Sequence, residues 1–407
     1  MAQLRSGHQV QLLQGGLAFF TALIDDIELS VHEVRFETYI FNTQGMGATI
    51  AQALERAAGR GVAVFLVMDG VGTPEISDEW ARRFDAAGVK WQIFSPLGRW
   101  GLLIPSRWRR LHRKLCVVDG RVAYCGGVNV LDDFFDPNHG VLAFPRFDFS
   151  VRVVGPLVQS VHEATARFWW RLQAVRTMTE SDFQAAWQAL QKAVQVTLAS
   201  RHHNKIVRDP ADNPLASAKA YLVLRDNLLN RTRIERSYRK AIGEAQTEII
   251  IANAYFLPGR KLRQGLIHAA QRGVRVRLLL QGRYEYFLQF HATRPVYGAL
   301  LAAGVEIHEY AVSFLHAKVA VIDGHWATVG SSNLDPLSLL LAREANVVVD
   351  DVVFAQLLRS QLLSAMVKEG VRVDPEGYTH RPLRQRVLDL LSLGLVRIML
   401  FLYGKRY

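Results

Sequence analysis

The chain has few cysteines and no long uninterrupted hydrophobic run. Cys116 and Cys125 are the only two cysteines among 407 residues. They flank a predicted turn and could face each other across a hairpin, but two thiols in so long a chain predict no disulfide framework. We therefore expect reduced thiols in a cytoplasmic protein. No stretch approaches the roughly 18 apolar residues that a membrane-spanning helix requires, so we expect any membrane contact to be made at the surface.

Two further absences narrow the class of protein. The apolar run at residues 17–24 is short, ends in Asp25 and Asp26, and lacks a small-residue cleavage site. We therefore expect no signal peptide. The sequence also contains no cluster of carboxylates that would hold a divalent cation. From this pattern we predict no metal site and no cofactor.

The composition is that of a globular protein with excess positive charge. Hydrophobic residues make up 50% of the chain and charged residues 21%, which excludes a disordered protein. The length suits two domains with a large core. The formal net charge of +12 favours anionic partners, namely nucleic acid, anionic lipid or a phosphorylated substrate. Charge alone does not distinguish among these three.

The two halves of the sequence repeat each other. Residues 51–62 resemble residues 263–274. Each segment is typical of a helix that ends at a glycine, Gly61 or Gly273, and an apolar strand follows each one. Strands that alternate with helices indicate an α/β fold in each half. Because the period is about 210 residues, far longer than a solenoid repeat, we interpret the pattern as a domain duplication.

The repeat also predicts where the domains end. Part of the segment between the halves, residues 183–198, has helical periodicity. Another part, residues 201–214, is polar and basic, and we interpret it as a solvated loop. The predicted division is a first domain at residues 1–176, a linker at 177–217, a second domain at 218–372 and a tail at 373–407.

Each half carries the same polar motif in the same register. A histidine and a lysine stand two positions apart, an aspartate follows, and a glycine-rich turn ends in asparagine. The first copy comprises His112, Lys114, Asp119, Gly126 and Asn129, and the second comprises His316, Lys318, Asp323, Gly330 and Asn333. The histidine and lysine open an apolar strand, so both side chains leave the same face. The glycine-rich turn should present the asparagine back toward the histidine.

These residue types suit the cleavage of a phosphate diester. A neutral imidazole can attack phosphorus, and a second, protonated imidazole can donate to the departing oxygen. An ordinary histidine pKa near 6.5 allows both roles close to neutral pH. Lys114 and Lys318 would bind the phosphoryl oxygens, with hydrogen bonds added by Asn129 and Asn333. These groups could replace a divalent metal.

The motif resembles the signature of the phospholipase D superfamily, H-x-K-x4-D-x6-G-[GS]-x-N, and both copies satisfy it. With the flanking repeat, the resemblance extends to about residue 370. It implies an α/β fold of two tandem phospholipase D-like domains, each a mixed β-sheet flanked by helices, related by a pseudo-twofold axis. It also implies one metal-free site shared by both histidines, with His112 as the nucleophile and His316 as the general acid and base.

The same resemblance implies an acidic residue that orients each histidine. Glu344 stands at the familiar distance after His316, and Asp148 is the corresponding candidate for His112. A surface salt bridge is the alternative role for Glu344. Asp119 and Asp323 belong to the catalytic motif, but we expect them to hold the turns that follow the motif strands.

The residues around the motifs resemble those of bacterial cardiolipin synthases. The similar segments are residues 111–119, 126–129, 151–156 and 330–336. Such enzymes transfer a phosphatidyl group from one phospholipid to the hydroxyl of another, usually phosphatidylglycerol. Leu337 stands where many members carry arginine, and a pair of N-terminal spanning helices is missing. Both departures resemble the shorter cardiolipin synthase B group and leave phosphatidylethanolamine open as a donor.

Other activities use the same residues. A phospholipase would resolve the intermediate with water and release phosphatidic acid. A nuclease of the superfamily is suggested by the net charge. However, the basic residues adjoin apolar runs and form no long stripe with stacking aromatics, so we expect no nucleic-acid partner. A non-catalytic scaffold is disfavoured because both motifs are intact.

Two segments are candidates for lipid contact. Residues 386–403 form an apolar stretch whose three charged positions fall in a wedge of roughly 80° on a helix. This pattern fits an interfacial helix, or equally a helix packed on the domain or on a second subunit. Residues 101–110 combine apolar residues, a tryptophan and arginines, which suits an anionic membrane surface or a buried strand with a basic turn. The resemblance and these segments predict peripheral attachment to the cytoplasmic face of the cell membrane.

Overall fold

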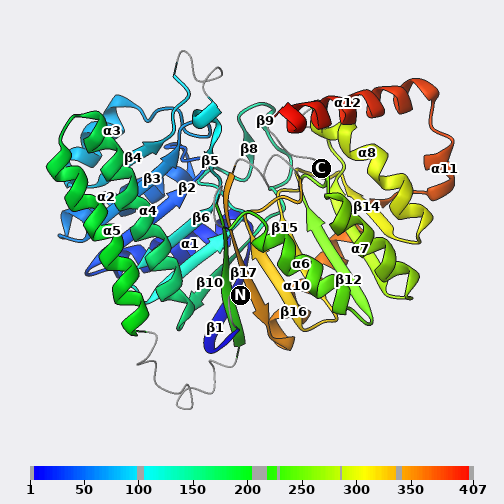
Figure 1. Ribbon diagram of the computed structural model, residues 1–407, viewed down its shortest axis with the longest axis horizontal. Coiled ribbons are helices and arrows are strands. Elements are labelled where there is room, and N and C mark those ends of the chain that lie inside the picture. Colours follow the sequence, from blue (N-terminus) through cyan, green and yellow to red (C-terminus); the bar gives the residue numbers. More distant parts are fainter. Residues whose placement is uncertain are drawn as a thin grey trace. The chain divides into compact units, whose positions relative to one another are not determined.

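The computed structural model describes residues 4–98, 105–203, 218–226, 230–284, 287–335 and 342–402. The chain forms two compact units. Unit 1 comprises Met1–Asp132 and Ser150–Leu222, and unit 2 comprises Asp133–Phe149 and Val223–Tyr407. Each unit contains a mixed β-sheet flanked by helices, which confirms the predicted fold class (Figure 1).

Seven strands form the main sheet of unit 1. In spatial order they are β1 (Arg5–Gln14), β10 (Phe149–Val154), β7 (Val122–Gly126), β6 (Lys114–Val118), β2 (Glu33–Thr38), β3 (Ala63–Asp69) and β4 (Lys90–Phe94). The strands β2, β3 and β4 are parallel, whereas the pairs β2–β6, β6–β7 and β7–β10 are antiparallel. The first part of β11 (Ala218–Arg225) pairs with β1.

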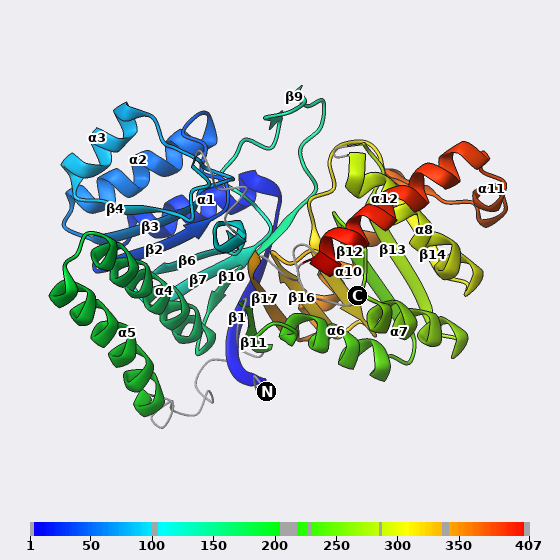
Figure 2. The same cartoon turned by 45° about the horizontal axis from the view of Figure 1, so that its top comes forward.

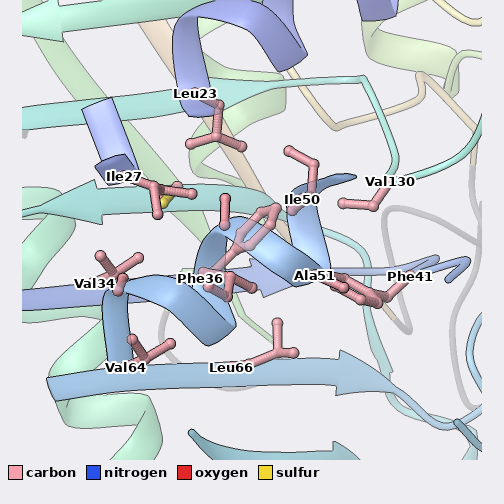
Figure 3. Close-up of a cluster of buried hydrophobic side chains, with 14 of the residues drawn as sticks. Leu23, Ile27, Val34, Phe36, Phe41, Ile50, Ala51, Val64, Leu66 and Val130 are labelled. Atoms are coloured by element: carbon pink, nitrogen blue, oxygen red, sulfur yellow. The ribbon is translucent and has the colours of Figure 1, made fainter. Parts of the chain in front are cut away.

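Helices cover both faces of this sheet because successive side chains of a strand point to opposite sides. The helices are α1 (Gly15–Glu28), α2 (Met46–Gly59), α3 (Asp78–Ala87), α4 (Leu157–Thr179) and α5 (Phe183–His203). In β3, Val64 and Leu66 pack in a core with residues of α1 and α2, such as Leu23 and Ile50 (Figure 3). Phe65, on the opposite side of β3, packs against Trp169 of α4.

Unit 2 repeats this strand order. Its sheet runs β17 (Ala342–Asp350), β16 (Trp326–Gly330), β15 (Lys318–Ile322), β12 (Glu248–Asn253), β13 (Arg275–Gln281), β14 (Glu306–Tyr310) and β18 (Gly370–Arg372). The described helices before the tail are α6 (Arg233–Glu244), α7 (Arg260–Gln271), α8 (Phe287–Ala302) and α10 (Val352–Lys368). The last residue of β3, Asp69, pairs with Phe94, and the last residue of β13, Gln281, pairs with Tyr310. The duplication therefore extends to the register of the strands.

The compact units differ from the predicted division in two places. Residues 133–149, which hold the short strands β8 (Phe135–Asp136) and β9 (Gly140–Val141), belong to unit 2 although they lie in the first half of the sequence. The predicted boundary at residue 176 falls inside α4, and α5 packs against α4 within unit 1. The helical part of the predicted linker is therefore part of a folded unit. Residues 204–214 of the predicted basic loop lie outside the described residues.

The C-terminal tail forms α11 (Pro375–Thr379) and α12 (Leu383–Leu402), and α12 packs along α8 (Figure 2). Leu393 and Val396 are buried on the inner side of α12. Asp389 is also buried there, where it accepts a hydrogen bond of 2.9 Å from Arg381 and lies 2.7 Å from Nδ1 of His291. A packed helix, one of the two predicted alternatives, is thus present. None of the described helices is long and apolar enough to cross a membrane.

The two cysteines form no disulfide. Both are buried on neighbouring strands, but Cys116 pairs with Tyr124 and Cys125 pairs with Leu115 in the register of β6 and β7. They therefore do not stand opposite each other across the hairpin. Burial raises the pKa of the Cys116 thiol, which keeps it protonated near neutral pH.

Candidate active site

The motif aspartates hold a turn at one end of each motif strand. Asp119 follows β6 with a φ of 51°, and Asp323 follows β15 with a φ of 50°. The carboxylate of Asp119 accepts hydrogen bonds of 2.8–2.9 Å from three successive backbone amides, at residues 31–33. Asp323 accepts bonds of 2.8–3.0 Å from the amides of residues 246–248. Each aspartate thus ties its turn to the start of the neighbouring strand, as expected from the sequence.

These contacts make the turn aspartates sensitive to acid. Burial raises the pKa of each carboxyl, but the backbone N–H groups outweigh it and hold the pKa of Asp119 and Asp323 below the usual 3.8. The charged form is therefore favoured by folding. This contribution is fully present above pH 3.8 and is lost as the pH falls through that value toward the lower folded pKa.

Replacing Asp119 by alanine is expected to destabilise the protein by about 2 kcal/mol. The change removes the acceptor for three amides and places alanine in a left-handed conformation, which it adopts poorly. Asp119→Asn is the matched control, because asparagine tolerates this conformation and keeps one acceptor. Urea unfolding at pH 7 and at pH 3 measures the effect, and the loss should shrink at the lower pH. Equal stability of the alanine variant and the wild type at pH 7 would refute this role.

The motif glycines allow two strands to approach closely. A Cβ atom at Gly126 would lie 2.0 Å from Oγ of Ser150, and one at Gly330 would lie 2.4 Å from the side chain of Asn346. Each of these neighbours is paired with the glycine across the sheet. A larger residue would push β10 or β17 away from the strand that carries the motif turn.

In unit 1, the histidine and lysine lie beside an aromatic ring. The strand β6 begins at Lys114, next to the end of its antiparallel neighbour β2. The ring of Tyr39, just after β2, lies 5.0 Å from the ring of His112, and Nζ of Lys114 lies 5.4 Å from the Tyr39 ring. Lys114 is buried and donates a 2.8 Å hydrogen bond to the carbonyl oxygen of His112. Asn129 lies nearby, with its Oδ1 accepting from the amide of Ile40 at 3.3 Å.

Tyr39 was not predicted from the sequence. Its position in unit 2 is taken by Ala254, so the tyrosine is not part of the repeated pattern. Only its place in the sequence could have indicated a role at the site, because Tyr39 directly follows β2 at the end where the motif strand β6 begins. Its ring contacts both His112 and Lys114, and a cation above an aromatic face is stabilised.

In unit 2, a buried carboxylate holds the histidine. Oδ2 of Asp148 lies 2.6 Å from Nδ1 of His316, and the side chain of Asp148 is 4% exposed. The amide of His316 also donates to the carbonyl of Phe147 at 2.9 Å, and the amide of Phe147 donates to the carbonyl of Phe314 at 3.0 Å. The residues around Asp148 and His316 therefore run side by side. When Nδ1 donates to the carboxylate, Nε2 carries the lone pair in the neutral ring and a proton in the protonated ring, so it can serve as a base or as an acid.

This contact corrects the predicted pairing of acids and histidines. From the sequence, Asp148 was expected to orient His112 and Glu344 to orient His316, but the carboxylate of Asp148 lies against His316. The physical reason is that residues 133–149 fold with unit 2 and not with the half that precedes them. Position along the sequence is therefore a poor guide to which histidine an acid reaches.

Glu344 is completely buried, so the alternative of a surface salt bridge is excluded. Its Oε2 accepts a hydrogen bond from the hydroxyl of Ser331, in the motif turn, and that hydroxyl also accepts from the amide of Ala345 at 3.1 Å. Lys318, in the same unit, is buried and donates to the carbonyl of His316. Asn333 is buried at the end of the motif turn.

The site residues share a chemical character. Each motif histidine has a buried lysine bonded to its carbonyl oxygen, and His316 also has a buried carboxylate at its ring. Within the part of the chain that the structure describes, no group of three or more histidine, cysteine, aspartate or glutamate side chains is placed to hold a metal ion. The arrangement provides imidazole nitrogens for nucleophilic and acid–base steps and lysines for an anionic oxygen.

Comparison with known proteins agrees with this chemistry. The family model described as "Cardiolipin synthase, PLD-like domain" matches residues 23–145 and 238–366. The protein named cardiolipin synthase B of Escherichia coli K12 is 36% identical over 380 residues, which cover 91% of this chain and 83% of that protein. The cardiolipin synthase of Oceanobacillus iheyensis is 27% identical, over 94% of this chain and 74% of that protein.

A solved structure shares the fold. The phosphatidylserine synthase of Haemophilus influenzae superposes with a TM-score of 0.65 over 98% of this chain and 95% of that chain, at 12% identity. The match supports the arrangement of the fold and, at this identity, nothing finer. Together with both family-model matches and the relatives above, it leads to one conclusion: the chain belongs to the cardiolipin synthase family of proteins with phospholipase D-like domains.

Proposed function

We propose that the protein is a phosphatidyltransferase that makes cardiolipin from phosphatidylglycerol and a second phospholipid. The observation that carries the proposal is the pairing of His316 with a buried carboxylate, in a chain with two complete copies of the motif. Such a pair orients the imidazole and stabilises its protonated form during proton transfer. The family membership supports the lipid substrate.

The proposed reaction has two halves. In the first, Nε2 of His112 attacks phosphorus of the donor lipid, the bond to the leaving glycerol oxygen breaks, and His316 gives that oxygen its proton. The product is a phosphatidyl-histidine. In the second, neutral His316 takes the proton from the hydroxyl of phosphatidylglycerol, the oxygen attacks phosphorus, and His112 leaves. Both histidines return to their starting protonation states.

The remaining motif residues have binding roles in this proposal. Lys114 and Lys318 are held by the carbonyls of their own histidines, which keeps each ammonium group close to its imidazole. Ammonium groups at that position stabilise negative charge on the phosphoryl oxygens. Asn129 and Asn333 add hydrogen bonds. Tyr39 packs against both His112 and Lys114.

The test of this function is lipid product analysis. Purified protein with phosphatidylglycerol vesicles is expected to form cardiolipin and to release glycerol, and added glycerol should reverse the reaction. Phosphatidylethanolamine replaces phosphatidylglycerol as the donor in a parallel reaction. Phosphatidic acid as the only product would instead establish a hydrolase. Cleavage of plasmid DNA with no lipid turnover would establish a nuclease and overturn the proposal.

We further propose that unit 2 attaches to an anionic membrane surface at the cytoplasmic face. The outer side of α12 carries a continuous stripe of exposed apolar residues, formed by Leu383, Val387, Leu390, Leu391, Leu395 and Ile398. These positions follow helical spacing and lie opposite the side packed on α8. Exposed Arg384, Arg386 and Arg397 lie within or beside the stripe. Apolar side chains next to arginines suit the boundary between lipid headgroups and acyl chains.

A second apolar surface lies near His316. The hairpin of β8 and β9 exposes four large side chains, Phe134, Phe135, Val141 and Phe144. Its position in unit 2 is tied to the residues before His316, because Ser313 donates a 2.7 Å hydrogen bond to the carbonyl of Phe144. Residues 101–104 of the other predicted lipid-contact segment lie outside the described residues, and its remainder forms a 3₁₀ turn at Pro105–Trp108 and the short strand Arg110–Leu111.

Replacing Leu383, Val387 and Leu391 by glutamine is expected to weaken binding to phosphatidylglycerol vesicles by at least about tenfold, since each half-inserted side chain contributes about 1 kcal/mol. Vesicle sedimentation measures this. The matched control replaces three exposed apolar residues of α10, Val353, Leu357 and Val367, which lie outside the stripe. Equal binding of the α12 variant and the control would contradict attachment through α12.

A further inference from the structure

The backbone immediately before each motif histidine is held by the last side chain of a parallel strand, β3 in unit 1 and β13 in unit 2. In unit 1, the amide of Leu111 donates a 2.6 Å hydrogen bond to Oδ2 of Asp69. In unit 2, the amide of Leu315 donates a 3.1 Å bond to Oε1 of Gln281. Leu111 and Leu315 directly precede His112 and His316. The same contact therefore occurs once in each half.

The two anchors occupy equivalent positions. Asp69 ends β3 and Gln281 ends β13, and each is followed by a glycine, Gly70 or Gly282. The amide of Gly70 donates to the carbonyl of Phe94, and the amide of Gly282 donates to the carbonyl of Tyr310, at 2.8 and 2.9 Å. A Cβ atom on Gly70 would lie 2.4 Å from the backbone of Pro96. This close approach fixes the direction of the chain after the strand and hence the position of the anchor.

The surroundings of the anchors differ between the units. Oδ1 of Asp69 accepts from the guanidinium of Arg110 at 3.1 Å and from the amide of Val71 at 2.8 Å. Burial raises the pKa of Asp69, while Arg110 and the backbone amides oppose this rise. In unit 2, Phe314 stands at the position of Arg110.

Unlike Asp69, Gln281 uses only one of its polar atoms in a hydrogen bond. Nε2 of Gln281 is buried and has no hydrogen-bond partner among the described residues. An unpaired buried donor costs about 1–3 kcal/mol. Of the two polar atoms of this side chain, the oxygen is therefore the one that makes a hydrogen bond, which it accepts from the amide of Leu315. In unit 2, an uncharged amide oxygen is thus the acceptor for the amide that precedes the motif histidine.

We propose that Asp69 and Gln281 are positioning residues, which set the location of His112 and His316 by accepting from the preceding amide. The side chains of Leu111 and Leu315 are buried, so each histidine follows a residue that is fixed by both packing and a hydrogen bond. A displacement of about 1 Å in a reacting group can reduce a rate by about 10²-fold. The inference rests on the proposed phosphatidyl transfer and adds two residues outside the recognised motif.

Substitution of Gln281 provides the cleaner test, because it removes one hydrogen bond and no charge. Gln281→Met is expected to lower kcat for cardiolipin formation by about tenfold to a hundredfold with little change in the KM for phosphatidylglycerol. Gln281→Glu keeps an acceptor and should recover most of that loss. In hydrogen exchange, peptides that contain the Leu315 amide should exchange faster in the methionine variant than in the wild type.

Gln356→Met is the matched control, since Gln356 also bonds to a backbone group, the carbonyl of Gly324, far along the strand from His316. It should lower the melting temperature without lowering kcat. In unit 1, Asp69→Leu should reduce kcat, and Asp69→Asn should restore most of it, because an amide oxygen serves in unit 2. An unchanged kcat in Gln281→Met would overturn the proposal. If the wild type itself transfers no lipid, the proposed function fails instead, and unaltered exchange at Leu315 would then overturn the anchoring role.

Discussion

Replacing His316 by alanine is expected to lower cardiolipin formation by about 10⁴-fold or more while the protein remains folded. The change removes the imidazole that protonates the leaving oxygen, and general acid–base catalysis contributes up to about 10⁴-fold. His112→Ala should abolish turnover completely, because it removes the nucleophile. Rates of product formation from radiolabelled phosphatidylglycerol, together with melting temperatures, measure both effects.

The chain contains a matched control for the histidine variants. Nδ1 of His325 lies 2.8 Å from a carboxylate oxygen of Asp350, but this pair is exposed and lies at the opposite end of β15 from His316. His325→Ala should therefore keep full activity. Quenched with detergent at neutral pH, because the P–N bond of a phosphohistidine is acid-labile, His316→Ala should retain a phosphatidyl-histidine, whereas His112→Ala should not. The intermediate accumulates because the second step, which needs a base for the incoming hydroxyl, becomes slower than the first. Full activity in either motif variant, or trapping in His112→Ala alone, would refute the assigned roles.

Asp148→Asn is expected to lower kcat by about 10²–10⁴-fold with a small effect on KM. The carboxylate accepts from Nδ1 of His316, and an amide in its place supplies no negative charge and can present its NH₂ group to the ring. The imidazole would then lose both its orientation and its stabilisation when protonated. Steady-state kinetics on mixed vesicles give the two constants separately.

Asp350→Asn tests whether any His–Asp contact has this effect. It changes the exposed partner of His325 in the same way and should leave kcat within about threefold, since exposed ion pairs contribute little. A normal kcat for Asp148→Asn would show that the contact with His316 has no catalytic role. A fall in kcat equal to that of the control would lead to the same conclusion.

The local features of the site could be predicted because they depend on short-range rules. The two-residue alternation of a strand placed His112 and Lys114 together, and an Asp-Gly pair after an apolar run indicated the turns at Asp119 and Asp323. The duplication was readable because the two copies preserve their spacing. The structure adds the reason for that spacing, which is the identical register of the two sheets.

The features that were missed depend on contacts between distant segments. The partner of Asp148 is 168 positions away, and the pairing depends on which unit its segment joins. Asp69 and Gln281 differ in residue type, so they are not among the residues that the two halves share. What the two residues share is an equivalent position, directly before the glycine that follows β3 or β13. Tyr39 has no counterpart in the second half and left no repeated pattern.

The course of the chain has a consequence for how the two halves can change independently. The sequence leaves unit 1 after Asp132, returns at Ser150, and passes to unit 2 again after Leu222. No single cut separates the units. A fragment that ends at residue 217 contains Asp148, so the remaining half loses the carboxylate that pairs with His316. The ancestral repeats have therefore become interdependent: neither half could be exchanged, lost or expressed alone without removing a part from the other.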